Sequence, residues 1–381
     1  AAAGSSAVDH AVADGSGRAA TRPKVGLVVI GNGAGIFLRC MSGVLEHFDP
    51  DRLELVVVCS AGTRNSLAPH LQNPRLGWHI LPDEFSQMVP ALAAGRFDVL
   101  YHWEVGSGPQ NYFLPFFGAA PVQCTGWGLP DTTGIPQLEY YLTSTSVEPP
   151  GAQTQYSEQL CFSDQLLTWQ SRIPAPETPA TREEFGISSW QTLYVCAQHV
   201  RKLHPDFDEM LAGVLRLDPE GVCLLVQDRT GYGANRVQQR MARTIPDVAG
   251  RVRWLPRLTV DQYRRLISTA DVLLDTPHFG GGLTTFDAFS LGIPVITLPG
   301  TFRRSRYASA CYRLMGLDCG IADNLQEYVT LAVALGRNRD IRESVSRSIL
   351  ARSDVLFENR QVVREFERIF CELAARKPGP A

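Results

Sequence analysis

The feature that most constrains this chain is an alternation of short, unbroken apolar runs with longer helical segments. Five such runs lie at residues 25–30, 53–59, 99–102, 122–127 and 139–142, and five more at 192–196, 222–227, 252–255, 272–274 and 295–298. Continuous Val- and Leu-rich runs of this length are typical of parallel strands whose two faces are both covered by helices. The sequence therefore predicts an α/β fold with two successive parallel sheets.

The two arrays are separated by a stretch rich in Pro and Thr, IPAPETPA from Ile173, which has no apolar periodicity. This stretch predicts a linker over residues 166–190, between a domain at 23–165 and a second domain with closing helices at 191–381. Residues 1–22 are mostly Ala, Gly, Ser and Thr, and we expect them to form a disordered leader. In parallel α/β sheets ligands bind beyond the carboxyl ends of the strands, so we expect the site in the cleft between the halves.

Composition excludes several classes of protein. The net charge of −3 over 381 residues gives no general basic field for nucleic acid or an anionic membrane, and no apolar run approaches the ~20 residues that span a bilayer. The nine cysteines include no C-x-x-C pair, which argues against a zinc ribbon. Their odd number favours reduced thiols in a cytoplasmic compartment, although targeting to an organelle stays open.

The most informative segment is ADVLLDTPHFGGGLTTFDAFSLGIPVITLPG, from Ala270. A buried strand ends near Asp275, and three glycines then allow close approach of a ligand to the backbone. Thr284 and Thr285 lie where a helix should begin, with a hydroxyl available as the N-cap, and Asp287 falls in the first turn, where it could accept from ribose hydroxyls. This pattern predicts a phosphate-binding turn; the alternative is an ordinary glycine-rich loop capped by a threonine.

Several motifs of the chain, in this order, resemble the protein O-GlcNAc transferase/SPINDLY family. They are DPDRLEL from Asp49, PVQCTGWGLPDTTG from Pro121, YSE from Tyr156, DTP…GGGLTTFD from Asp275 and LGIPVITLPG from Leu291. The resemblance covers residues 24–374. It implies a GT-B fold, in which two Rossmann-like parallel-sheet domains face a cleft, the first on the acceptor side and the second binding a nucleotide sugar.

The resemblance also implies roles for individual residues. Lys202 falls on the lysine that contacts the donor diphosphate, where an ammonium would stabilise the leaving group, so it is a candidate catalytic residue. Thr284 matches a phosphate-binding threonine and Asp287 a ribose-binding acid. The remaining candidates for the nucleotide-sugar site are His199, Leu258 in the loop that holds the base, Tyr263 in place of a family histidine, His278, Gly281, Gly282, Thr285 and Arg306.

An acid or base is harder to identify. The turn at residues 31–35 contains no histidine, whereas animal members of the family carry one there. His102 and Glu104 follow a predicted strand toward the cleft, and His102 is the candidate for proton transfer. The alternative is that His102 only packs beside Trp103. The run at residues 303–306 could clamp phosphates or simply form a solvated helix start.

These features predict an inverting glycosyltransferase that moves a sugar, GlcNAc first among the candidates, from UDP-GlcNAc to Ser or Thr hydroxyls of proteins. UDP-Glc and GDP-Fuc stay open as donors. The sequence shows no carboxylate cluster of the kind that binds hard cations and no His/Cys ligand spacing, so we expect no metal and no cofactor besides the donor. The family carries TPR repeats ahead of its catalytic region, and none occur here. The alternatives are a non-catalytic member that binds a nucleotide sugar or a protein partner, and an epimerase.

Overall fold

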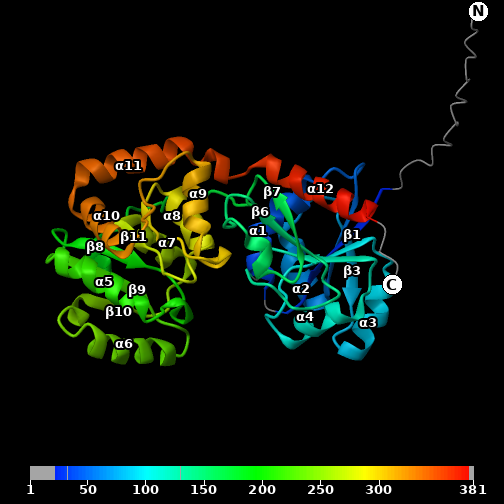
Figure 1. The fold of residues 1–381 in the computed structure, drawn as a ribbon, viewed down its shortest axis with the longest axis horizontal. Coiled ribbons are helices and arrows are strands. Elements are labelled where there is room, and N and C mark those ends of the chain that lie inside the picture. The colour runs from blue at the N-terminus through cyan, green and yellow to red at the C-terminus, as the bar shows by residue number, and fades with distance from the viewer. Residues whose placement is uncertain (1–21, 32, 129, 377–381) are drawn as a thin grey trace, which may run out of the picture.

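The computed structural model describes residues 22–31, 33–128 and 130–376, and it forms two lobes side by side (Figure 1). The predicted leader lies outside this range, except for Arg22. Each lobe contains one sheet whose strands all run parallel. The predicted α/β class with two successive parallel sheets is therefore confirmed.

The N-terminal sheet has the strand order β3-β2-β1-β4-β5-β6-β7, so the chain reverses direction across the sheet between β1 and β4. Its central strands are buried at nearly every position because helices cover both faces. The strands are β1 (Lys24–Val29), β2 (Glu54–Ser60), β3 (Gly77–Leu81), β4 (Val99–His102), β5 (Val122–Thr125), β6 (Tyr140–Ser144) and β7 (Gln159–Ser163).

The C-terminal sheet has the order β10-β9-β8-β11-β12, with a similar reversal between β8 and β11. Its strands are β8 (Thr192–Cys196), β9 (Gly221–Val226), β10 (Val252–Leu255), β11 (Val272–Leu274) and β12 (Val295–Ile296). At such a reversal the two connections leave on opposite faces of the sheet, which opens a crevice at the carboxyl ends of the strands.

Helices fill the connections and cover the sheets. In the N-terminal lobe these are α1 (Ala34–His47), α2 (Ala61–Leu67), α3 (Phe85–Ala94) and α4 (Pro109–Phe113). The later helices are α5 (Asp206–Leu217), α6 (Tyr232–Thr244), α7 (Val260–Thr269), α8 (Leu283–Ser290), α9 (Tyr307–Leu314), α10 (Leu325–Arg337), α11 (Arg339–Arg352) and α12 (Arg360–Ala375). No helix in the described part of the chain is both long and apolar enough to span a bilayer.

Two edge strands, β3 and β7, were absent from our sequence prediction. Strand β3 is largely half-exposed and β7 alternates between buried and exposed positions, so neither has the unbroken apolar run that marks the central strands. An edge strand lacks a neighbour on one side and buries less of its surface, which weakens the signal in the sequence.

The structure differs from the predicted domain boundaries in two places. The predicted linker begins with a buried segment, in which Trp169 packs on α1 and its amide donates to the Cys40 carbonyl over 2.7 Å. The last helix, α12, returns to the N-terminal lobe (red in Figure 1), where it packs on α1 and β4. There Phe366 and Phe370 lie edge-on to Tyr101. Because the apolar face of α12 fits this lobe, residues 191–381 do not form one domain.

Candidate functional site

A buried carboxylate holds the glycine-rich turn after β11 in place. Asp275 follows the strand and accepts hydrogen bonds from the Gly281 amide over 2.7 Å and from the Thr297 hydroxyl over 2.9 Å. Burial raises the pKa of Asp275 to about 6, and the hydrogen bonds counteract part of that shift. These bonds fix the path of the turn above the sheet.

The turn also requires its glycines for space. A Cβ atom at Gly281 would lie 2.6 Å from both the Gln198 amide nitrogen and the Thr284 hydroxyl, and one at Gly280 would lie 2.7 Å from the Asp275 carboxylate. Three polar side chains therefore approach the backbone more closely than any other residue type would allow.

The side chain of Lys202 contacts the same turn. It ends the short 3-10 turn Val200–Lys202, and its Nζ donates to the Gly280 carbonyl over 2.7 Å and to Gln198 Oε1 over 3.2 Å. Its Nζ also lies 4.3 Å from the centre of the Phe279 ring. Burial lowers the pKa of Lys202, since a charged ammonium loses hydration there. Lys202 therefore lies beside the glycine turn, and its predicted contact with a diphosphate stays a prediction.

Gln198, which the sequence analysis overlooked, links the two parts of the site. Its amide nitrogen donates to the Thr284 hydroxyl over 2.7 Å while its oxygen accepts from Lys202. We had assigned the polar role to His199, whose side chain is exposed and accepts instead from the Arg201 amide. A shift of one residue separates the two, and only the buried position of Gln198 at the end of β8 distinguishes it.

Helix α8 begins at Leu283, directly after Gly282, and no side chain caps it. The expected threonine N-cap is therefore wrong: Thr284 accepts from Gln198, and Thr285 donates to the Gly281 carbonyl over 2.9 Å. The first amides of a helix have no partner inside it, and they carry the positive end of the helix dipole. An uncapped helix start beside an ammonium is a suitable place for a phosphate.

The carboxylate of Asp287 forms an ion pair with an arginine of the other lobe. It lies on α8, is 3% exposed, and forms an ion pair with Arg39 of α1 at 2.6 Å between Oδ1 and Nη2. Tyr263 of α7 lies beside this pair, and burial together with the Asp287 charge raises the pKa of its phenol. The pair joins the two lobes at the point where we predicted ribose binding.

The N-terminal lobe contributes an open cavity of about 620 Å³ at the carboxyl ends of β1 and β4. Gly31, Gly33, Ile36 and Glu104 are among its lining residues. A Cβ atom on Gly33 would overlap the Glu104 carboxylate, so the glycine makes room for the acid. Burial raises the pKa of Glu104, despite a hydrogen bond from Ser107 at 3.3 Å. A carboxyl group of this kind can accept a proton near neutral pH.

His102, our candidate for proton transfer, points elsewhere. It is 3% exposed inside the N-terminal sheet, and its Nε2 lies 3.0 Å from Gln123 Oε1. Burial lowers the pKa of His102 to about 4. The packing alternative therefore describes His102, whereas Glu104, two residues further on, lines the cavity.

The other predicted site residues have structural partners. Arg306 donates to the carbonyls of Val147 and Gly300, each over 2.9 Å, which ties the lobes together. His278 is exposed and bonds Asp206 at 2.7 Å. Leu258 is half-buried against the hydrophobic core in the loop after β10.

The arginines beside Arg306 also lie at the interface between the lobes. Arg303 is buried among the rings of Trp127, Tyr141 and Tyr307, 3.9 Å from Glu148. Arg304 pairs with Asp131 of the N-terminal lobe. These arginines hold the interface between the lobes and do not form a phosphate clamp.

Sequence comparison identifies relatives of the chain. Residues 171–366 match the model of glycosyl transferase family 41. The chain is 24% identical over 267 residues to a probable UDP-N-acetylglucosamine–peptide N-acetylglucosaminyltransferase SPINDLY from Petunia hybrida, and 26% identical over 271 residues to the SEC protein of Arabidopsis thaliana with the same probable activity. These matches cover 66% and 67% of this chain but only 28% and 27% of the relatives, so the chain spans little more than a quarter of their length.

Solved structures show the same architecture. A mutant O-GlcNAc transferase from Thermobaculum terrenum superposes with a TM-score of 0.77 at 20% identity, over 93% of this chain and 68% of that one. Anabaena HepE in complex with UDP and glucose superposes with a TM-score of 0.57 at 14% identity, over 91% of this chain and the whole of HepE. These likenesses confirm the predicted GT-B fold.

The family match extends over slightly more than half of the chain, and the curated relatives carry the names that the sequence motifs had suggested. The predicted resemblance to the O-GlcNAc transferase/SPINDLY group is therefore confirmed. The chain belongs to glycosyl transferase family 41.

Proposed function

We propose that this chain is the catalytic region of an inverting glycosyltransferase, which moves GlcNAc from UDP-GlcNAc to Ser or Thr hydroxyls of proteins. The observation that carries this proposal is the chain of hydrogen bonds from Lys202 through Gln198 to Thr284, at the uncapped start of α8. The names of the SPINDLY and SEC relatives support the choice of donor and acceptor.

The donor diphosphate would lie on the first amides of α8. Lys202 would exchange its bond to the Gly280 carbonyl for a phosphate oxygen, and so would neutralise the charge that develops as the diphosphate leaves. The loop at Leu258 and the ring of Tyr263 would border the nucleoside, and Asp287 would accept from the ribose. In this scheme protein groups neutralise the charge of the leaving group, and no metal ion is required.

The acceptor would enter through the N-terminal cavity. A Ser or Thr hydroxyl oxygen forms the new bond to the anomeric carbon, the bond to the diphosphate oxygen breaks, and the hydroxyl proton passes to Glu104. Attack from the side opposite the leaving group inverts the anomeric centre. The raised pKa of Glu104 suits it to this role near neutral pH.

One observation favours the alternative of a member that binds a nucleotide sugar without transferring it. The Arg39–Asp287 ion pair occupies the carboxylate that a ribose would use, and it must separate before that contact forms. In a regulatory member the pair would simply persist.

Nucleotide binding and sugar transfer can be tested separately. We would measure thermal stabilisation by UDP, UDP-GlcNAc, UDP-Glc and GDP-Fuc, then incubate the preferred donor with a cell lysate and detect modified peptides by mass spectrometry. The proposal expects stabilisation by UDP-GlcNAc that is lost in Lys202→Ala and kept in Arg201→Ala, the exposed neighbour. Stabilisation without transfer would favour the regulatory member, and no stabilisation by any nucleotide would refute both.

A further inference from the structure

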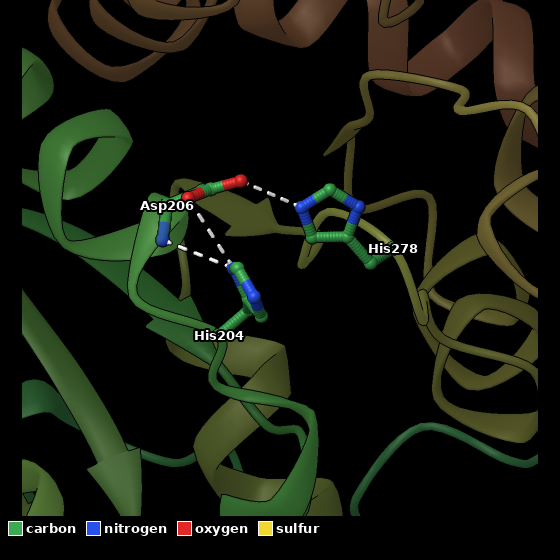
Figure 2. A group of neighbouring side chains, drawn as sticks. All are labelled: His204, Asp206 and His278. Atoms are coloured by element: carbon green, nitrogen blue, oxygen red, sulfur yellow. Dashed lines mark hydrogen bonds and ion pairs between the residues drawn. The ribbon is translucent and has the colours of Figure 1, made fainter.

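Two histidines and an aspartate meet at the rim of the glycine turn, although they are far apart in the sequence. His204 and Asp206 lie at the start of α5, and His278 lies in the loop after β11, 72 residues beyond Asp206 (Figure 2). One nitrogen of each histidine and one carboxylate oxygen all lie within 4.8 Å of one another.

Both histidine side chains lie against the carboxylate of Asp206. His278 Nε2 lies 2.7 Å from Asp206 Oδ2, and His204 Nδ1 lies 3.3 Å from Asp206 Oδ1. The two imidazole rings stand edge to face with their centres 4.5 Å apart. Each side chain is between 51% and 61% exposed, so an ion can reach the cluster from solvent and keep a water ligand.

The ligand atoms of this cluster favour one class of metal ion. Two imidazole nitrogens and one carboxylate oxygen suit Zn²⁺ and its neighbours in the first transition row, whereas Mg²⁺ and Ca²⁺ prefer ligands that are all oxygen. With Zn–ligand distances near 2.1 Å, tetrahedral geometry places neighbouring ligand atoms about 3.4 Å apart. His204 Nδ1 lies at 3.3 Å from Asp206 Oδ1, close to this value, whereas His278 Nε2 lies at 2.7 Å from Oδ2 and would need to withdraw by about 0.7 Å as the carboxylate turns one oxygen toward the ion.

Two features of the backbone prepare the histidines for this role. His278 has φ of +62°, a left-handed conformation that residues with a side chain rarely adopt, and Arg304 Nε holds its carbonyl at 3.2 Å. His204 Nδ1 accepts from the Asp206 amide over 3.3 Å, so this nitrogen carries no proton, and a metal ion would replace the amide as the partner of its lone pair. Metal ligands need that unprotonated form.

We propose that His204, Asp206 and His278 form a binding site for one divalent transition-metal ion, Zn²⁺ in the first instance. The ion would fasten the loop after β11 to the start of α5. That loop leads within two residues to Gly280, whose carbonyl accepts from Lys202. The site lies outside the contacts assigned to the donor, and it does not depend on the proposed transfer reaction. Its ligands come from two distant segments, so no metal motif appears in the sequence.

The test is a direct metal titration of the full chain after treatment with a chelator. Zn²⁺ binding is followed by calorimetry, and Co²⁺ binding by visible absorption, because cobalt bound to thiolate gives a charge-transfer band that imidazole and carboxylate ligands do not. This distinction matters because the chain has nine free cysteines. The expected result is one ion per chain, with a cobalt spectrum that lacks the thiolate band.

Two variants remove one ligand each. His278→Asn deletes the imidazole but keeps a residue type that tolerates the left-handed backbone, and His204→Ala deletes the other imidazole. Each should weaken Zn²⁺ binding more than tenfold, because loss of even an outer-shell partner has effects of that size. His70→Ala, at an exposed histidine of the N-terminal lobe, should bind as the unmodified chain does. The proposal is overturned if the unmodified chain binds no Zn²⁺, if both variants keep their affinity, or if the cobalt spectrum shows thiolate ligation.

Discussion

The turn after β11 and the turn after β1 both adjoin the strand reversal of their own sheet, yet they are built in opposite ways. At the first, Asp275, Gln198, Thr284 and Lys202 bind one another and the backbone, so the polar groups are fixed before a ligand arrives. At the second, glycines leave an open cavity with one half-buried carboxylate, Glu104. The difference teaches that the C-terminal lobe is preorganised for one anionic ligand, while the N-terminal lobe provides space for acceptors of varied shape.

Replacing the ammonium of the preorganised turn should have the largest effect. Lys202→Met keeps the length of the side chain but removes the charge that would meet the leaving diphosphate, so we expect kcat to fall about 10²–10³-fold. Arg201→Met, one residue earlier and exposed, is the matched control. Transfer is measured by mass spectrometry of an acceptor peptide. Unchanged kcat in Lys202→Met would show that this turn does not carry the leaving group.

The second largest effect is expected for Glu104, the carboxylate in the open cavity. Glu104→Gln should lower kcat about 10²-fold, because the proton of the acceptor hydroxyl loses its base. Since burial raises the pKa of Glu104, kcat/KM of the unmodified chain should fall as the pH drops through that raised pKa. The variant should lose this acidic limb of the profile. Its melting temperature at neutral pH should equal or exceed that of the unmodified chain, because a partly buried charge is removed.

A smaller change tests whether the position of Glu104 matters. Gly33→Ala would place a methyl group where the Glu104 carboxylate lies, so the carboxylate must move and the rate should fall about tenfold. Gly35→Ala makes the same substitution within α1, where a Cβ atom meets no other group within 4 Å. This control should leave the rate unchanged and raise stability by about 0.5–1 kcal/mol. If both variants show equal rates, the space beside Gly33 has no role in catalysis.

A further prediction concerns the ion pair between Arg39 and Asp287, which joins the two lobes. Arg39→Ala leaves the buried Asp287 carboxylate without its partner, so the free energy of unfolding should fall by about 1–3 kcal/mol in chemical denaturation. The same change frees Asp287 for a ribose, and UDP affinity measured by calorimetry should rise a few-fold. A fall in UDP affinity would mean that Arg39 itself contacts the donor. Asp287→Asn in the Arg39→Ala background should restore part of the stability, since no buried charge is left unpaired.

The sequence predicted the fold because its central strands are buried on both faces and leave unbroken apolar runs. The edge strands β3 and β7 gave no such run and were missed. The motif around Lys202 predicted a diphosphate shared with the helix start at Thr284, and the structure brings these two segments together. The roles of Gln198 and Glu104 were not, because they depend on which neighbouring residue turns inward at the end of a strand. The Arg39–Asp287 pair joins residues 248 apart, and no local pattern marks such a contact.

The return of α12 to the N-terminal lobe has a consequence for dissecting this protein. A fragment that stops near residue 190 would expose the aromatic surface around Tyr101 that Phe366 and Phe370 cover, and should aggregate on expression. The same fragment should be rescued by a synthetic peptide of residues 359–376, which would make the N-terminal lobe and α12 a pair for split-protein complementation.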